Sequence, residues 1–231
     1  MLRNAGQADP GAGWHAGAMT EATVRTVNVV HALREGYFHR TAIDKRPVRG
    51  AVRVGPRGLA GDEQVDRNHG GADRAVYVYA DEDAAWWAER LGREIPPGLF
   101  GENLRTTGLD VTGARVGEQW AVGDDVVLEV RRIRTPCENL ALRLGIEGFH
   151  LEFLRSGRVG AMCRVLAEGE VRAGDPVRRV LRPTHRVTIG RLARDTTTPE
   201  QMQELLDSGI PLAPGVRTKA TRVAGQAASS V

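Results

Sequence analysis

The sequence predicts a mainly β fold with a few short helices at its periphery, and three observations support this. The run at 23–32, TVRTVNVVHA, is rich in valine and partly alternating, which is typical of a strand. Turns made of glycine and an acidic residue come directly before short valine-rich runs, at Gly117-Glu118, Gly123-Asp124 and Gly174-Asp175. Helical patterns are short and few. Many short strands joined by tight turns indicate a barrel or a sandwich.

The strand at 23–32 marks the start of the folded part, so we expect residues 1–20 to form a disordered tail. One main β domain is predicted over 21–182. A small helical extension is predicted over 183–214, where Thr198 can cap a helix that carries Pro199 in its first turn. After Pro214 the chain turns to Thr, Ala, Gly and Ser, and we expect 215–231 to be a disordered tail.

Three further helices are expected inside the main domain, at 81–91, 138–144 and 147–154. In the first, Asp81 can serve as the cap and Trp86 and Trp87 lie on the packing side. Adjacent tryptophans could form a platform for stacking bases. On a short amphipathic helix they are more often core anchors, and this is the role we expect.

Composition excludes several classes of protein. The chain has 231 residues, 41% hydrophobic and 26% charged, and no apolar run approaches the roughly 18 residues of a membrane span. A net charge of +3 with scattered arginines gives no basis for nucleic-acid binding. The first twenty residues lack the apolar core of a secretory signal, and two cysteines in such a chain favour reduced thiols, although counting leaves one bridge between them open. We therefore expect a cytoplasmic protein with neither a membrane nor a nucleic-acid partner.

Cys137 is the best candidate for a reactive atom. It follows a strand-like stretch, stands after Pro136 at a stiff corner, and has Arg132 and Arg134 close by in sequence to favour its thiolate form. The alternative is a buried structural cysteine, and the local sequence alone does not decide between the two. Cys163, inside the apolar run 159–166, is interpreted as a strand-core residue.

A loop crowded with glycine, aspartate and histidine spans 58–74 and leads into a strand-like run at 75–79. Gly70 and Gly71 would let backbone amides approach a ligand, His69 can donate or accept a proton, and Asp73 can orient a partner group. An elaborate turn without a ligand is the alternative. A metal site at Asp62, Asp66 and His69 would need a helix that the neighbouring glycines disfavour, and no CxxC or HExxH spacing occurs.

Asn103 lies in a second glycine-containing polar segment, FGENLRTTG, which follows Pro96-Pro97. Its side-chain amide offers one donor group and one acceptor, which suits a planar heterocycle. It can equally close its own turn, and spacing does not separate these two roles.

Four ordered blocks carry a resemblance to a known family. They are AIDKRPV at 42–48, the segment from Gly61-Asp62 to HGGADRAV at 69–76, FGENL at 100–104 and RTPC at 134–137. The chain resembles the MOSC domain family, named for the C-terminal domain of molybdenum cofactor sulfurases, and within it a YiiM-like bacterial branch. The resemblance implies a MOSC-type β-barrel whose Cys137 faces a pocket for molybdenum cofactor, with no pyridoxal phosphate domain in this chain.

The resemblance also implies the site residues. Cys137 becomes the catalytic thiol and metal ligand. The candidates for holding the cofactor or the substrate are Lys45, His69, Gly70, Gly71, Asp73, Arg74, Asn103 and Arg134. Two positions depart from the family pattern: Arg74 replaces a common Lys and keeps the charge, whereas Asn139 replaces a Lys and loses it. Arg134 or Arg143 would then have to supply the fork that grips a phosphate.

The function implied first is a molybdenum-cofactor-dependent reductase of N-hydroxylated compounds, such as hydroxylaminopurine-type base analogues, with Cys137 as a soft thiolate ligand. Its partners would be a small-molecule substrate and an electron-donor protein, and the cofactor could be lost on purification. Two alternatives stay open. One is a sulfur carrier that holds a persulfide on Cys137, supplied by a separate desulfurase. The other is a non-catalytic module that binds a pterin or another small molecule.

Overall fold

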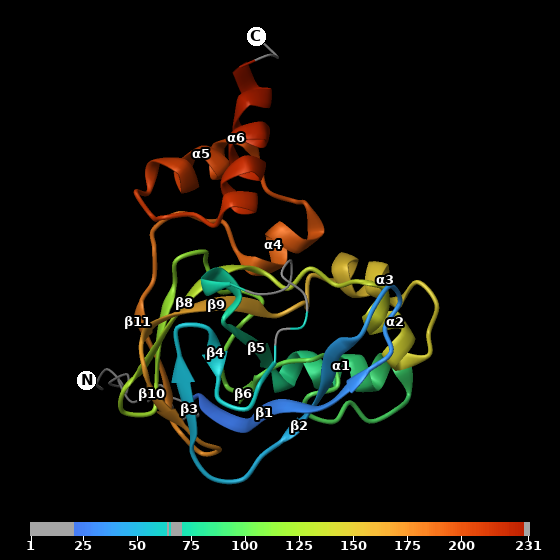
Figure 1. Cartoon of the computed structure of the whole chain (residues 1–231). Coiled ribbons are helices and arrows are strands. Elements are labelled where there is room, and N and C mark those ends of the chain that lie inside the picture. The colour runs from blue at the N-terminus through green and yellow to red at the C-terminus, as the bar shows by residue number, and fades with distance from the viewer. Residues whose placement is uncertain (1–20, 64, 66–70, 229–231) are drawn as a thin grey trace, which may run out of the picture.

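The computed structural model describes residues 21–63, 65 and 71–228. The predicted tail at 1–20 lies outside the described residues, as do Asp66, His69 and Gly70. The described chain forms two sheets with short helices around them (Figure 1). A mainly β architecture with peripheral helices is therefore confirmed.

The larger sheet has eight strands in the order β11-β7-β8-β9-β5-β6-β1-β2. They are β1 (Thr23–Arg34), β2 (Thr41–Pro47), β5 (Val76–Ala80), β6 (Leu104–Thr107), β7 (Gln119–Val122), β8 (Val126–Ile133), β9 (Ala161–Ala167) and β11 (Val177–Leu181). Among the described strand pairs only β5 and β6 run parallel, so the sheet is mixed. A smaller sheet pairs β3 (Val52–Gly55) with β10 (Gly169–Val171) and β4 (Gly58–Leu59).

The closed barrel expected from the resemblance is not detected. In the described chain β2 and β11 end the large sheet and do not pair with each other. A single bridge between Thr23 and Pro176 brings the start of β1 to the segment before β11. Register shifts at 24–26 and again after Val30 divide β1, whose first part pairs with β6 and whose later part pairs with β2. Since bulges of this kind bend a strand, β1 curves from one partner to the next without closing the ring.

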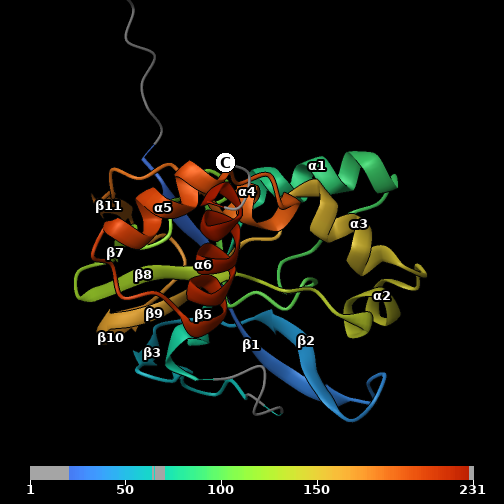
Figure 2. The ribbon, with the colours of Figure 1, turned by 90° about the horizontal axis from the view of Figure 1, so that it is seen from above.

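Three helices, α1 (Asp81–Leu91), α2 (Glu138–Leu144) and α3 (Phe149–Ser156), gather on one side (Figures 1 and 2). Aromatic rings of α1 and α3 pack against each other and against the sheet residue Tyr79. Trp87 is fully buried, with its ring centroid 5.6 Å from that of Phe153. The predicted core role of Trp87 is thus confirmed. The predicted cap at Asp81 is wrong: the N-cap is Ala80, and Asp81 instead pairs with Arg25 and Arg105.

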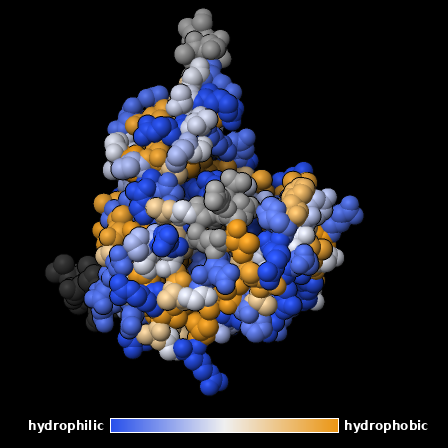
Figure 3. All heavy atoms as spheres, in the orientation of Figure 1, coloured by the Kyte–Doolittle hydropathy of each residue, from blue (hydrophilic) through white to orange (hydrophobic). Residues whose placement is uncertain are grey.

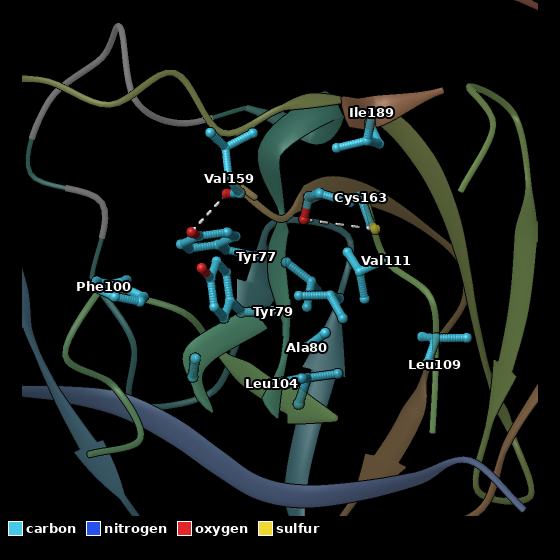
Figure 4. Packing of buried hydrophobic residues seen from close by; sticks show 14 of the residues in the cluster. Tyr77, Tyr79, Ala80, Phe100, Leu104, Leu109, Val111, Val159, Cys163 and Ile189 are labelled. Atoms are coloured by element: carbon cyan, nitrogen blue, oxygen red, sulfur yellow. Dashed lines mark hydrogen bonds between the residues drawn. The ribbon is translucent and has the colours of Figure 1, made fainter. Parts of the chain in front are cut away.

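The centre of the sheet is shown in Figure 4. There the hydroxyl of Tyr77 donates a hydrogen bond to the Val159 carbonyl at 2.8 Å, and Cys163 is buried in the same cluster of residues. Cys163 is 0% exposed on β9, and burial raises the pKa of its thiol far above the ordinary value. Its predicted role as a strand-core residue is confirmed.

The C-terminal extension contains α4 (Ile189–Arg194), α5 (Pro199–Asp207) and α6 (Pro214–Ala228), with a hydrophobic core of its own. Thr198 closes a capping box with Gln201, as the Thr-Pro signal predicts. The disordered tail expected at 215–231 is wrong for 215–228, which belongs to α6. Residues Val216, Ala220 and Val223 repeat at helical spacing and are buried in that core, so packing outweighs the weak local composition.

His185 fastens the segment that leads into this extension, and it makes stability depend on pH. Its Nε2 lies 2.8 Å from the Val116 carbonyl, and its Nδ1 accepts the Val187 N–H at 3.2 Å, so the ring is held neutral. Burial lowers the pKa of His185 below its ordinary value of 6.5. The unfolded chain therefore binds this proton more readily than the folded chain does, and stability falls as the pH drops below 6.5.

We expect the thermal unfolding midpoint to drop between pH 7 and pH 5 by more in the wild type than in His185→Gln, because glutamine carries no charge at either pH. Differential scanning fluorimetry at the two pH values measures this. Equal drops in the two proteins would show that His185 does not contribute to the pH dependence.

Candidate functional site

A cavity opens beside β2 and is lined by several of the residues that the sequence singled out. Lys45, Arg74, Asn103, Arg134 and Cys137 all face it. Its volume is about 130 Å³, roughly ten times the minimum that a single water requires, so it can hold a larger polar group. We call it the thiol cavity.

Cys137 is the thiol that reaches this cavity. It is half-buried and stands immediately before α2, at the end of the link from β8 that contains Pro136. No disulfide joins it to Cys163, which is sealed in the core. Of the two sulfur atoms, only that of Cys137 is placed to meet a bound molecule.

A buried chain of polar groups fixes one wall of the cavity. Lys45 Nζ lies 2.6 Å from Asp62 Oδ2, and the two side chains are 11% and 6% exposed. Asn103 Nδ2 donates to the same carboxylate oxygen at 2.8 Å, while the other oxygen accepts the Val30 N–H at 3.0 Å. Burial lowers the pKa of the Lys45 ammonium, and the Asp62 carboxylate opposes that change. The ion pair with Asp62 therefore holds the Lys45 ammonium at a fixed position.

Asn103 is oriented towards the protein more than towards a ligand. Its Oδ1 accepts the Tyr77 N–H at 3.0 Å and its Nδ2 bonds Asp62, so both ends of the amide are engaged. The side chain is fully buried. Its geometry fits a residue that positions Asp62, and through it Lys45, better than one that reads a heterocycle.

Arg134 contributes a second held cation. Its guanidinium Nη1 donates to the Thr135 carbonyl at 2.8 Å, and no carboxylate lies within ion-pair distance of it in the described part of the chain. Arg40 and Arg74 also line the cavity, so the described part of its lining contains four cationic side chains and two carboxylates, Asp62 and Glu63. Over the described residues, the lining thus contains more cationic than anionic side chains, which favours an anion.

Not every predicted residue lies in the cavity. Asp73, on the short helix η1 (Ala72–Arg74), accepts from Arg131 Nε at 2.9 Å and from Arg164 Nη2 at 2.6 Å. It fastens η1 to β8 and β9 and is absent from the lining. Gly71 is exposed, with φ at 100°, a conformation that suits glycine.

A metal site built from Asp62, Asp66 and His69 receives no support, because Asp62 is committed to Lys45 and the other two lie outside the described residues. Over residues 21–63, 65 and 71–228, no group of three or more His, Cys, Asp or Glu could hold a metal ion.

Asn139 and Arg143 each take a structural role near the cavity. Asn139 Oδ1 accepts the Tyr37 N–H at 2.7 Å and holds the 35–40 loop against α2. Arg143 lies in a different cleft, where it pairs with Asp44. Of the two arginines expected to grip a phosphate here, only Arg134 is in place. The loop residues His39 and Arg40 also line the cavity, and no local sequence signal pointed to them.

No helix in the described chain is both long enough and apolar enough to cross a membrane. On the face shown in Figure 3, hydrophilic and hydrophobic residues are interspersed.

Comparison with known proteins identifies relatives. A family model described as the MOSC domain matches residues 65–178. The chain is 38% identical over 141 residues to the uncharacterized protein YflK of Bacillus subtilis, a match that covers 61% of this chain and 63% of that protein. It is 36% identical over 151 residues to a protein named Reductase from Gibberella moniliformis, covering 62% of this chain and 26% of that protein. The matches thus span less than two thirds of either relative.

Among solved structures, YiiM from Geobacillus stearothermophilus superposes with a TM-score of 0.71 at 25% identity. The match covers 87% of this chain and 98% of that one. The similarity therefore extends well beyond the segment that the family model covers, into the C-terminal extension.

Proposed function

This chain belongs to the MOSC domain family, and we propose that it binds molybdenum cofactor in the thiol cavity and reduces N-hydroxylated compounds, with Cys137 as a ligand of the metal. One observation carries the proposal: the reachable thiol stands in a cavity whose described lining contains more cationic than anionic side chains. A soft donor and an anion cradle are the two features that a metal-bearing pterin phosphate requires.

The residues present fit this group. A thiolate from Cys137 suits molybdenum, because soft sulfur ligands are preferred by soft metals. Lys45 and Arg134 can bind phosphate oxygens, the ammonium as a point charge and the guanidinium as a fork. When bound, the cofactor would supply the two-electron reduction that no side chain of this protein can perform.

The chain's own residues would do the positioning. Asp62 and Asn103 hold Lys45, so the cation meets an anion without reorganising. Pro136 limits the backbone before Cys137, which keeps the sulfur facing the cavity. Arg134 lines the same cavity and would neutralise charge beside the sulfur.

The substrate class and the partners are part of the proposal. A relative named Reductase favours redox chemistry over simple binding. An N-hydroxylated base analogue would enter at the open side of the cavity, and electrons would come from a separate donor protein. We propose a cytoplasmic location for this reaction.

Elemental analysis tests the proposal. Protein purified from a host that makes molybdenum cofactor should contain close to one molybdenum per chain. Cys137→Ala should contain at least about tenfold less molybdenum, because a direct ligand is lost. Cys163→Ala is the matched control and should retain the metal. Equal molybdenum contents in wild type and Cys137→Ala would contradict the assignment of the ligand.

The same samples test the sulfur-carrier alternative, which the position of Cys137 also favours because a persulfide needs a reachable thiol. Intact mass spectrometry would then show one added sulfur atom in Cys163→Ser and none in Cys137→Ser, without molybdenum. Small-molecule binding with neither molybdenum nor added sulfur would instead favour a non-catalytic module.

A further inference from the structure

A second cleft lies beside β2 and is lined by three arginines, Arg34, Arg46 and Arg143. We call it the arginine cleft. Its volume is about 450 Å³, within the range of small-molecule sites. Asp44 and Lys45 also line it, together with the apolar side chains of Pro47, Pro96, Pro97 and Leu99.

One buried carboxylate, that of Asp44, lies near all three arginines. Arg34 Nη2 lies 2.7 Å from Asp44 Oδ2, and Arg143 Nη2 lies 3.1 Å from Oδ1. Arg46 Nε is 3.6 Å from Oδ1, which is too long for a hydrogen bond. Burial would raise the pKa of Asp44, but the bonds and charges of Arg34 and Arg143 outweigh it and hold the pKa below its ordinary value. Asp44 is therefore ionised, and this single carboxylate faces three arginines, while Lys45, which also lines the cleft, is paired with Asp62.

The arginines retain donors for a ligand. Arg34 directs both Nε and Nη2 at the same carboxylate oxygen, and Arg143 donates Nε to the Leu99 carbonyl at 2.9 Å and Nη2 to Asp44. Across the described residues, no hydrogen bond joins Arg46 or the Nη1 groups of Arg34 and Arg143 to an acceptor. Each planar guanidinium can therefore present N–H groups to an added anion.

The wall that carries the prolines is rigid. Two prolines limit the backbone of the 96–101 loop, and Gly98 follows them with φ at 83°. A Cβ at position 98 would lie 2.3 Å from the Lys45 carbonyl oxygen, so only glycine lets this loop approach β2 so closely. The cleft is thus preformed, with an apolar face of Pro and Leu that can pack on an organic group.

Among the described residues, the arginine cleft and the thiol cavity share Lys45 alone in their linings. Successive residues of a strand point to opposite faces, so the Asp44 and Lys45 side chains diverge from β2. The Lys45 ammonium meets Asp62 in the thiol cavity, whereas Asp44 meets the arginines. Cys137 lines the first site and not the second.

We propose that the arginine cleft binds a small organic phosphate, with the phosphate on Arg34, Arg46 and Arg143 and the organic part against the proline wall. Arginine forks bind phosphate oxygens in pairs, which gives both affinity and orientation. The proposal does not depend on molybdenum or on Cys137.

Isothermal titration calorimetry of the full chain tests it, with adenosine monophosphate, inorganic phosphate and adenosine as probes. Adenosine monophosphate should bind, inorganic phosphate should bind more weakly, and adenosine should not bind detectably. Arg46→Gln should weaken the binding of adenosine monophosphate about tenfold. The reason is that Arg46 makes no hydrogen bond to Asp44 and is the arginine most available to the ligand. The matched control is Arg53→Gln, an exposed arginine on β3 that should leave affinity unchanged.

Cys137→Ala should bind adenosine monophosphate as the wild type does, whether or not the proposed function holds. Equal affinity in Arg46→Gln and wild type would overturn the proposal, as would adenosine binding as tightly as its monophosphate. Inorganic phosphate binding as tightly as adenosine monophosphate would overturn the role of the proline wall.

Discussion

Cys137→Ala is expected to lose at least about 100-fold in the rate of reduction of an N-hydroxylated purine, since removing even an outer partner of a metal ligand costs 10–100-fold. The sulfur of Cys137 is the one that reaches the thiol cavity, and no other thiol in the described chain can replace it. The rate is measured with cofactor-loaded protein and an artificial electron donor.

Two controls separate chemistry from folding. Cys163→Ala removes a sulfur sealed in β9 and should keep the rate within a few fold, although it loses some stability by leaving a small void. Circular dichroism should show the wild-type fold in Cys137→Ala, because this half-buried residue contributes little to the hydrophobic core. An active Cys137→Ala protein would refute the catalytic assignment.

Glu102→Ala should cause the largest loss of stability, about 3–5 kcal/mol, the range for breaking a buried ion pair. Glu102 is 0% exposed and accepts the Gly98 N–H at 2.8 Å, the Phe100 N–H at 3.2 Å and Arg105 Nε at 2.8 Å. Its removal leaves the fully buried guanidinium of Arg105 with Asp81 as its remaining carboxylate partner among the described residues. Urea unfolding followed by tryptophan fluorescence gives the change.

The matched control for Glu102 is Glu168→Ala. Glu168 also pairs with an arginine, Arg53 at 3.3 Å, but the two side chains are 45% and 69% exposed. Solvent screens such a pair, so the free energy of unfolding should change by less than about 1 kcal/mol. If the two variants lost similar stability, the buried position of Glu102 would not be the cause.

The sequence predicted elements well where neighbouring residues determine the local structure by themselves. Thr198 and Pro199 start α5 because the cap and the first-turn proline act within four residues. The helix after Cys137 begins at Glu138 and ends before Gly145, whose left-handed conformation terminates it. By contrast, α6 depends on Val216 and Ala220 packing into a distant core, and composition alone gave the wrong result.

The site was predictable only in part, because its residues are brought together by strand pairing. Lys45 and Cys137 were identified separately, and the structure places them in one cavity. The Lys45–Asp62 ion pair was missed, since the two are 17 positions apart and meet only through the fold. Asp73 was assigned to the site because it lies in the glycine-rich block. In the structure its carboxylate instead accepts a hydrogen bond from Arg131 on β8. No local pattern marks that difference.

The most direct test of the account is alkylation of the native protein with iodoacetamide, mapped by peptide mass spectrometry. We predict that Cys137 is labelled in protein from a host that lacks molybdenum cofactor and is protected in protein loaded with it, while Cys163 stays unlabelled in both. Equal labelling of Cys137 in the two preparations, or no labelling in either, would contradict the claim that Cys137 is the reachable thiol of a cofactor site.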